Sequence, residues 1–321
     1  KQLTKLILRL ADLSEKYKST PMVSRTNGQD AIPTTFGMLT ASYMAELNRN
    51  LSRMREAKER SRVGQLGSAV GTLSSLGPKA LEIQKSALKN LGLKVPDMSW
   101  NASRDNYAEV VQVLALINGT LGRVATDINL WSRTADNSVN EGEGGASSTM
   151  PQKRNPRASE FLGGLAAMSR IRASGALEML NQSETRQGAP WISEWSTIPE
   201  MFMTTSTALD RANRLFDKII VKPEVMKARF NDAKQFVMAE AVQQSLASKV
   251  GLGQAHSLVV QAIKKTSKDT DFRTVLVNDP EIKKYMNEKE IEYALEPTNY
   301  LGQASELVNR AVRIARSNTL K

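Results

Sequence analysis

The stretch GEGGASSTMPQKRNPRASE, residues 142–160, gathers small, polar and basic side chains in a chain whose patterns are otherwise helical. Successive glycines and small residues let backbone N–H groups converge into a concave nest, and Lys153 and Arg154 place positive charge beside it. Pro156 suits the first turn of a following helix, whose N-terminal dipole favours an anion. These features predict a site that binds a carboxylate or stabilises an enolate-like oxyanion. The alternative is a flexible surface loop that ends in a helix cap.

Other residue types that commonly carry chemistry are scarce. Cysteine is absent and His256 is the only histidine, so a thiolate nucleophile is excluded and neither a zinc site nor another metal site is expected. His256 lies in an apolar helical segment, and we interpret it as structural. Glu141 and Glu143 could form a carboxylate pair for acid–base chemistry, but beside three glycines they are interpreted as the solvated edge of a lid. Trp191 and Trp195 share one helix face, which favours core packing over substrate contact.

The charge balance favours anionic partners, because 44 Lys and Arg against 33 Asp and Glu give a formal net charge of +11. The basic residues are spread along the chain and aromatic residues make up only 5%, so a small acid is expected in preference to nucleic acid. Apolar runs fall short of the roughly 20 residues of a membrane span, so no membrane partner is expected. With its lack of cysteine, this composition predicts a cytoplasmic protein.

The elements that must position the polar loops are helices, because helical periodicity dominates and alternating β-branched runs are nearly missing. The predicted fold is therefore all-α. The predicted helices span residues 1–17, 35–62, 79–91, 104–135, 156–179 and 193–216. Helices of this length favour a central bundle, residues 1–220, which is often shared between subunits. Beyond it the helices are short and separated by turn signals, which predicts a small helical C-terminal domain, residues 221–321.

Several segments resemble one known family. SSTMPQKRNP resembles the signature loop of the fumarase/aspartase superfamily, GSSxMPxKxNP, with Ala146 where that pattern has glycine. Further matches follow in order: TPMVSRTNGQDAIPTTFG, QLGSAVGTLSSLG, SRDNYAE, TRQGAPWISEWSTIPE and LEPTNYLGQASELVNRAV. The Trp-x-x-Glu-Trp and Tyr-Leu-Gly elements are most similar to the 3-carboxy-cis,cis-muconate cycloisomerase branch, a sibling of the adenylosuccinate lyases. The resemblance covers nearly the whole chain.

The resemblance implies a homotetramer around a shared helical bundle, with each active site assembled from segments of three subunits. In such enzymes the serine three residues before the Met acts on the Cα proton, which places that role on Ser147. Ser148, Lys153 and Asn155 are then expected to hold the carboxylates and the aci-carboxylate intermediate. The full set of expected substrate-binding residues is Thr26, Asn27, Gln29, Gln65, Ser148, Met150, Lys153, Asn155 and Arg186.

The sequence also departs from the superfamily pattern. Asn27, Asn101 and Glu184 occupy positions where relatives commonly carry histidine. Asparagine cannot shuttle protons near neutral pH, although it still donates and accepts hydrogen bonds. Relatives also carry an N-terminal domain with another substrate-binding segment, and the sequence contains no counterpart of it.

The leading hypothesis is a cofactor-free lyase or cycloisomerase that acts on a di- or tricarboxylate through a stabilised carbanion. One alternative is an adenylosuccinate-type or other amino-dicarboxylate C–N lyase. The other is a catalytically inactive relative with a binding or structural role, since the three histidine positions are altered. The identity of the substrate depends on pocket residues that the pattern does not place.

Overall fold

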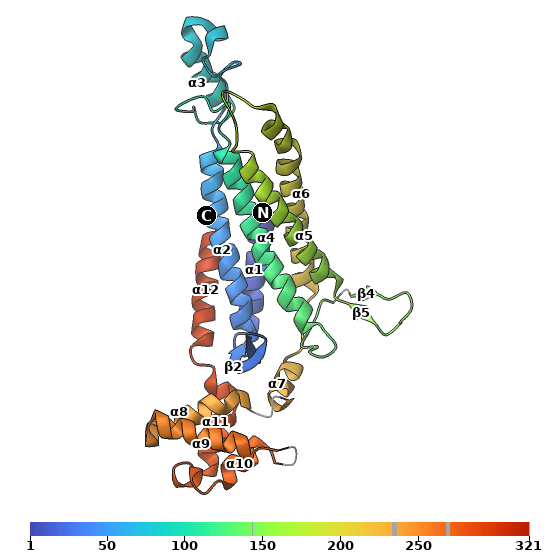
Figure 1. Cartoon of the computed structure of the whole chain (residues 1–321), viewed down its shortest axis with the longest axis vertical. Helices are drawn as coiled ribbons and strands as arrows, with labels where there is room; N and C mark the ends of the chain where they lie inside the picture. Colours follow the sequence, from blue (N-terminus) through green and yellow to red (C-terminus); the bar gives the residue numbers. More distant parts are fainter. Residues whose placement is uncertain (143, 233–235, 268–269, 321) are drawn as a thin grey trace. The chain divides into compact units, whose positions relative to one another are not determined.

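The structure is a computed structural model that describes residues 1–142, 144–232, 236–267 and 270–320. Over these residues the fold is nearly all α, as the periodicity predicts, with a few short strands (Figure 1). The chain divides into two compact units. The first comprises Lys1–Ile7, Ala45–Arg133 and Glu141–Ile219, and the second comprises Leu8–Met44, Thr134–Asn140 and Ile220–Lys321. The division into domains 1–220 and 221–321 stays a prediction.

Most predicted helices agree with the observed ones to within a few residues. The longer helices are α1 (Gln2–Lys16), α2 (Phe36–Ser61), α4 (Asp105–Trp131), α5 (Arg157–Glu178) and α6 (Gly188–Lys218). The shorter ones are α3 (Ala80–Asn90), α7 (Pro223–Asp232), α8 (Ala239–Val250), α9 (Leu252–Lys265), α10 (Phe272–Asn278), α11 (Glu288–Leu295) and α12 (Ala304–Thr319). Helix α6 begins before the predicted residue 193, because Pro190 falls in its first turn, where no backbone N–H is needed.

Helices α4, α5 and α6 form the packed core of the first unit (Figure 1). The residues that α4 buries recur at helical spacing and include Val113, Leu114, Ile117, Leu121, Val124 and Ile128. A few hydrogen bonds link the helices. Asn118 Nδ2 on α4 donates to Thr205 Oγ1 on α6 at 2.7 Å, and Gln112 Nε2 on α4 donates to the carbonyl oxygen of Ala173 on α5 at 2.7 Å. The bundle therefore holds α4 to both neighbouring helices.

Among the described residues, one helix, α4, is long and apolar enough to cross a membrane by length and composition alone. The same composition is typical of the core helix of a water-soluble bundle. Helix α4 fits that description, because most of its apolar residues are buried and it packs against α5 and α6. The feature is therefore weak evidence for a membrane span.

The second unit contains a β-hairpin that the helical prediction lacked. Strands β1 (Pro21–Thr26) and β2 (Gln29–Thr35) pair antiparallel, with Thr26 opposite Gln29 at the closed end. The two turn residues are Asn27 and Gly28, with φ angles of 53° and 77°. Asn-Gly is a common pair in a two-residue hairpin turn, because both residues tolerate a left-handed backbone. The hairpin thus holds Thr26, Asn27 and Gln29 close together.

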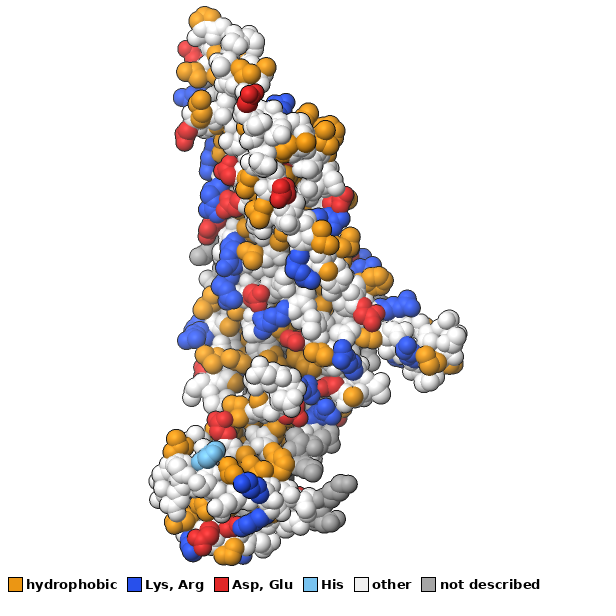
Figure 2. Space-filling view, in the orientation of Figure 1, with side chains coloured by type: hydrophobic (Ala, Val, Ile, Leu, Met, Phe, Trp, Pro, Cys, Tyr) orange, Lys and Arg blue, Asp and Glu red, His pale blue; other side chains and the backbone are white. Residues whose placement is uncertain are grey.

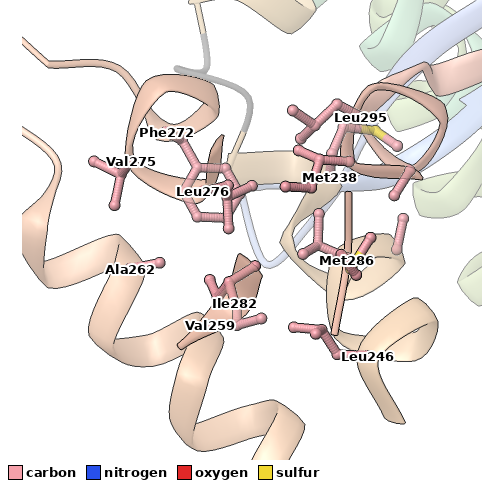
Figure 3. Close-up of a cluster of buried hydrophobic side chains, with 14 of the residues drawn as sticks. Met238, Leu246, Val259, Ala262, Phe272, Val275, Leu276, Ile282, Met286 and Leu295 are labelled. Atoms are coloured by element: carbon pink, nitrogen blue, oxygen red, sulfur yellow. The ribbon is translucent and has the colours of Figure 1, made fainter. Parts of the chain in front are cut away.

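A separate hydrophobic cluster stabilises the C-terminal helices of the second unit (Figure 3). Buried members contributed by α8 to α11 and their connections include Leu246, Val259, Phe272, Leu276, Ile282, Met286 and Leu295. Helix α12 instead contacts α1, where Arg316 Nη2 lies 2.8 Å from Asp12 Oδ1 and 2.9 Å from Glu15 Oε2. The predicted run of short C-terminal helices is therefore present, with α12 as a longer final element.

Candidate active site

The glycine-rich stretch forms a small hairpin at the start of α5 (Figure 1). Strands β4 (Gly145–Ala146) and β5 (Arg154–Asn155) pair antiparallel, with Gly145 opposite Asn155 and Ala146 opposite Arg154. Residues 147–153 form the tip between them. We call residues 145–155 the signature hairpin. In the space-filling view it extends from the bundle with basic and apolar side chains on its surface (Figure 2).

Backbone N–H groups in the signature hairpin converge on the hydroxyl of Ser147. Ser147 Oγ accepts hydrogen bonds from the N–H of Met150 at 3.1 Å and from the N–H of Thr149 at 3.4 Å. The turn is closed by the N–H of Lys153, which donates to the carbonyl oxygen of Met150 at 3.0 Å. Donors aimed at one oxygen stabilise negative charge on it. Ser147 therefore has two features of a proton-transferring serine, a fixed Oγ and donors to stabilise its alkoxide.

The other expected residues of this hairpin lie at its surface. Ser148, Met150 and Lys153 are exposed, and Asn155 is half-buried in β5. Lys153 lies at the end of the tip, next to the strand that carries Asn155. An exposed lysine and a free serine hydroxyl are groups that can bind a carboxylate from solvent. The hairpin thus places Ser147 among the groups expected to hold the substrate.

The sequence predicts that the start of α5 favours an anion. In the structure, a carboxylate of the same chain occupies that position. Glu141 accepts hydrogen bonds from the N–H of Ala158 at 2.8 Å and from the N–H of Ser159 at 2.9 Å. Its side chain is buried, with only 4% of the residue exposed. The interpretation of Glu141 as a solvated lid edge is therefore wrong, because its carboxylate caps α5 and complements the helix dipole. Glu143, the other residue of that expectation, lies outside the described residues.

Replacing Glu141 with Ala is expected to loosen the start of α5. The substitution leaves two N–H donors without their charged acceptor, and such hydrogen bonds contribute about 1.5–3 kcal/mol. Hydrogen exchange of the Ala158 and Ser159 amides is expected to report a loss of about 2 kcal/mol in local opening free energy. The matched control is Glu178→Ala at the exposed far end of the same helix. Unchanged exchange in Glu141→Ala would mean that the cap contributes nothing.

Two glycines fit the base of the signature hairpin closely. Gly142 has φ 78°, and a Cβ atom there would lie 2.2 Å from the carbonyl oxygen of Lys218. A Cβ on Gly145 would lie 2.3 Å from Cδ of Arg157. Backbone cannot move aside as a flexible side chain can, so Gly142 is the more restricted of the two. The glycines therefore fix how the hairpin leaves the bundle, in addition to shaping the nest.

Gln65 belongs to a second polar network, which lies between α2 and α4 in the sequence. Its Nε2 donates to Asn101 Oδ1, and its Oε1 accepts from the N–H of Trp100 at 3.1 Å. Asn101 Nδ2 in turn donates to the carbonyl oxygen of Ala69 at 3.0 Å. Asn101 is 7% exposed whereas Gln65 is exposed to solvent. The buried amide of Asn101 therefore orients the exposed amide of Gln65.

A buried ion pair lies directly beside that network. Arg104 Nε donates to Glu194 Oε1, and both side chains are at least nine-tenths buried. Tyr107 is close by, with its ring edge-on to Trp100 at a centroid distance of 5.5 Å. Burial raises the pKa of Tyr107, and the negative charge of Glu194 raises it as well, whereas Arg104 lowers it. The tyrosine therefore stays neutral at physiological pH.

Arg186 lies in the loop that connects α5 to α6. Its guanidinium carbon is 5.2 Å from the centroid of the Trp191 ring, which suits a cation–π contact. Trp191 meets Trp195 edge-on at 5.2 Å. Trp195 is 62% exposed in the single chain, so the prediction that it packs in the core is wrong. A helix face need not turn toward its own bundle, and this one presents aromatic surface to solvent.

The expected site residues fall into separate places. Helix α5 runs between the signature hairpin at its first residue and the Arg186 loop beyond its last residue (Figure 1). With a rise of about 1.5 Å per residue, its 22 residues span roughly 33 Å. That span is several times the length of a small tricarboxylate. The two ends of α5 are therefore too far apart for one small substrate molecule to span them.

Other expected residues lie elsewhere, and some groups beside them were not anticipated. Thr26, Asn27 and Gln29 are on the β1–β2 hairpin of the second unit. His256 is exposed on α9, with Nδ1 3.1 Å from Gln243 Oε1. The pattern of residue types did not single out Arg104 or Glu194. Both occur inside segments that match the superfamily, SRDNYAE and TRQGAPWISEWSTIPE, and a charged residue amid aromatic ones is the signal that could have found them.

The long-helix bundle and the signature hairpin define a lyase of the fumarase/aspartase type. Comparison with family models agrees. The model described as lyase matches residues 1–170, and the model described as adenylosuccinate lyase C-terminus matches residues 235–311. The chain belongs to the fumarase/aspartase superfamily of lyases.

Individual relatives are more informative about the branch. The chain is 35% identical to a 3-carboxy-cis,cis-muconate cycloisomerase of Pseudomonas aeruginosa, over 94% of this chain and 67% of the relative. It is 32% identical to an N-acetyl-S-(2-succino)cysteine lyase of Dickeya dadantii, over 97% of this chain and 70% of the relative. Its structure matches that of a 3-carboxy-cis,cis-muconate lactonizing enzyme from Pseudomonas putida with a TM-score of 0.93 and 33% identity, over 99% of this chain and 71% of that one. The chain thus spans about two thirds of the length of these proteins.

Proposed function

We propose that the protein is a cofactor-free cycloisomerase that acts on 3-carboxy-cis,cis-muconate or a closely similar tricarboxylate. The observation that carries the proposal is the hydroxyl of Ser147, held by two backbone N–H donors in the hairpin that resembles the superfamily's signature loop. The similarity to cycloisomerases in both sequence and structure supports the choice of substrate. The net charge of +11 suits a substrate with three carboxylates.

The proposed chemistry is a reversible addition across a double bond. In the ring-closing direction a carboxylate oxygen of the substrate adds to Cβ, and the electron pair of the double bond moves onto Cα and its carboxylate. The Ser147 hydroxyl then gives its proton to Cα. In the opposite direction the Ser147 alkoxide removes the Cα proton as the Cβ–O bond breaks. A serine can do this because the Met150 and Thr149 N–H groups stabilise the alkoxide.

The remaining residues of the signature hairpin are proposed to hold the substrate. The ammonium of Lys153 and the Asn155 amide are assigned to the aci-carboxylate, where charge increases in the transition state. The Ser148 hydroxyl and the Met150 side chain are proposed to contact the substrate in its bound ground state, before the reaction begins. On the other segments, we propose that polar groups of the substrate are bound by Thr26, Asn27, Gln29, Gln65 and Arg186.

We further propose that the protein is a homotetramer with sites shared between copies. Support comes from the roughly 33 Å that separates the two ends of α5, each of which carries expected site residues. An exposed apolar stripe on α5 adds to it, since Phe161 is 51%, Met168 45% and Ile171 74% exposed. A groove of about 330 Å³ on the same helix is lined by Arg157, Glu160, Phe161, Gly164, Leu165 and Met168, and we assign a helix of a second copy to it. A cytoplasmic location stays a prediction.

The alternatives differ in what they require of the protein. An adenylosuccinate-type C–N lyase must protonate a nitrogen leaving group, and asparagine at positions 27 and 101 cannot do so near neutral pH. A carboxylate oxygen that leaves or adds needs no such acid. The C–N lyase is therefore not favoured. An inactive relative could keep the same contacts, because serine hydroxyls commonly accept from N–H groups two or three residues on, so turnover separates this alternative.

Absorbance assays on the purified full-length protein test this function. We expect loss of the absorbance of 3-carboxy-cis,cis-muconate as the conjugated diene is consumed, and no fumarate released from adenylosuccinate. Fumarate release without consumption of carboxymuconate would overturn the proposal in favour of the C–N lyase. Inactivity on both, and on a panel of other fumarate-releasing substrates, would favour the non-catalytic alternative.

A further inference from the structure

We propose that Arg104 and Glu194 are positioning residues, which hold the Gln65–Asn101 amide pair in the orientation that receives substrate. Glu194 is near the start of α6, and Arg104 immediately precedes α4. Neither side chain is itself expected to touch substrate, since both are buried. The inference rests on the proposed function for its activity readout, but its structural part stands on the geometry alone.

The Arg104 guanidinium donates hydrogen bonds both to Glu194 and to the backbone next to Gln65's partners. While Nε donates to Glu194, Nη1 lies within hydrogen-bond distance of three backbone carbonyl oxygens in one stretch of chain, residues 100–103. The acceptors are the carbonyl oxygens of Asn101 at 2.8 Å, Ser103 at 3.0 Å and Trp100 at 3.3 Å. A planar guanidinium fixes the directions of its donors, so an anchored Arg104 fixes the backbone of residues 100–103.

The backbone that Arg104 contacts is in turn hydrogen-bonded to Gln65. The N–H of Trp100 donates to Gln65 Oε1, and the side chain of Asn101 accepts from Gln65 Nε2. Both polar ends of the Gln65 side chain are therefore held by the segment that Arg104 orients. Trp100 is held further by its own Nε1, which donates to the carbonyl oxygen of Gly64 at 2.9 Å. The path from α6 to Gln65 is thus a continuous set of hydrogen bonds.

The burial of the ion pair favours this role over a purely stabilising one. Desolvating two charges is costly, and a buried ion pair is often no more stable than apolar residues of the same size. What apolar residues cannot supply is a set of directed donors to the carbonyls of residues 100–103.

The test separates positioning from stability with a matched pair of variants. Glu194→Gln keeps the shape and an acceptor for Arg104 but removes the charge. The double variant Arg104→Met with Glu194→Leu removes both charges and refills the space with apolar atoms. The readouts are melting temperature, hydrogen exchange of the Trp100 amide, and kcat and KM for carboxymuconate.

We expect the double variant to melt close to the wild-type temperature yet to lose protection of the Trp100 amide. Its kcat/KM is expected to fall about 10- to 100-fold, because a small misplacement of a substrate-orienting group has effects of that size. KM should change more than kcat, and Glu194→Gln should show a smaller loss of the same kind. If either variant folds and keeps both Trp100 protection and KM at wild-type values, the pair is only structural and the inference is wrong.

The exchange readout is independent of the reaction. If the wild-type protein does not consume carboxymuconate, the proposed function fails, while Trp100 protection still decides whether Arg104 and Glu194 orient the network. Normal Trp100 protection in the double variant would then refute the inference on its own.

Discussion

Ser147→Ala is expected to lower kcat by about 10²–10⁴-fold, the usual contribution of a positioned proton-transfer group. Because the hydroxyl acts mainly in the transition state, kcat and kcat/KM should fall together while the affinity for a substrate analogue changes little. The loss is expected because the Ser147 hydroxyl is the group that the Met150 and Thr149 N–H groups hold. Steady-state kinetics and calorimetric binding of a carboxymuconate analogue measure the two quantities.

Ser148→Ala is the matched control, because the same substitution is made at the adjacent position of the same hairpin. Ser148 is exposed, and no donor is held on its hydroxyl in the described hairpin. Its loss is expected to weaken binding of the analogue by about 1–3 kcal/mol, as for a hydrogen bond to a charged group, with a smaller effect on kcat. Neither variant should change the melting temperature appreciably, since both hydroxyls lie outside the core. Near-normal turnover of Ser147→Ala would remove the catalytic role from this hairpin.

The sequence predicts local elements of this protein well. Helix α5 was expected at 156–179 and spans Arg157–Glu178, and α3 was expected at 79–91 and spans Ala80–Asn90. Both have clear boundary residues, Pro156 before α5 and Pro78 before α3. The β1–β2 hairpin was missed although its Asn27-Gly28 turn is visible in the sequence, because the flanking strands lack long β-branched alternation.

Contacts across long sequence distances could not be predicted in the same way. Glu141 reaches the N–H groups of residues 17 and 18 positions later, and only the folded hairpin brings them together. Arg104 and Glu194 are 90 positions apart, and their pairing depends on how α4 packs against α6. The neighbouring glycines favoured a solvated lid edge for Glu141, whereas a buried carboxylate needs partner groups. The partner groups here are backbone donors, which no sequence pattern marks.

The proposal of a shared site rests on the lengths of the helices together with the resemblance. Ser147 is at the start of α5, whereas Arg186 follows its end, and Gln65 lies in the connection that precedes α4. Since α5 separates its two ends by roughly 33 Å, the proposal takes the two ends of each site from different copies.

Two inactive variants are therefore expected to restore each other's activity when their subunits mix. One is Ser147→Ala, with a defective signature hairpin, and the other is Gln65→Ala, with a defective polar network. If each site takes these two segments from different copies, random mixing in equal amounts gives about a quarter of sites with both segments intact. Activity at low substrate concentration should rise accordingly.

The control mixture combines Ser147→Ala with Lys153→Ala, two defects in the same signature hairpin. Every site then receives one defective hairpin whatever the arrangement of copies, so no activity is expected to return. Native mass spectrometry establishes that hybrid assemblies form in both mixtures, and light scattering establishes whether the assembly is a tetramer.

The most direct measurement of the central claim is thus the turnover of carboxymuconate by the two hybrid mixtures, compared at equal protein concentration. We expect up to about a quarter of wild-type kcat/KM from Ser147→Ala with Gln65→Ala, and only the background of the separate variants from Ser147→Ala with Lys153→Ala. Equal, background-level turnover in both mixtures, with hybrid assemblies present, would contradict a site built from the signature hairpin of one copy and the Gln65 network of another.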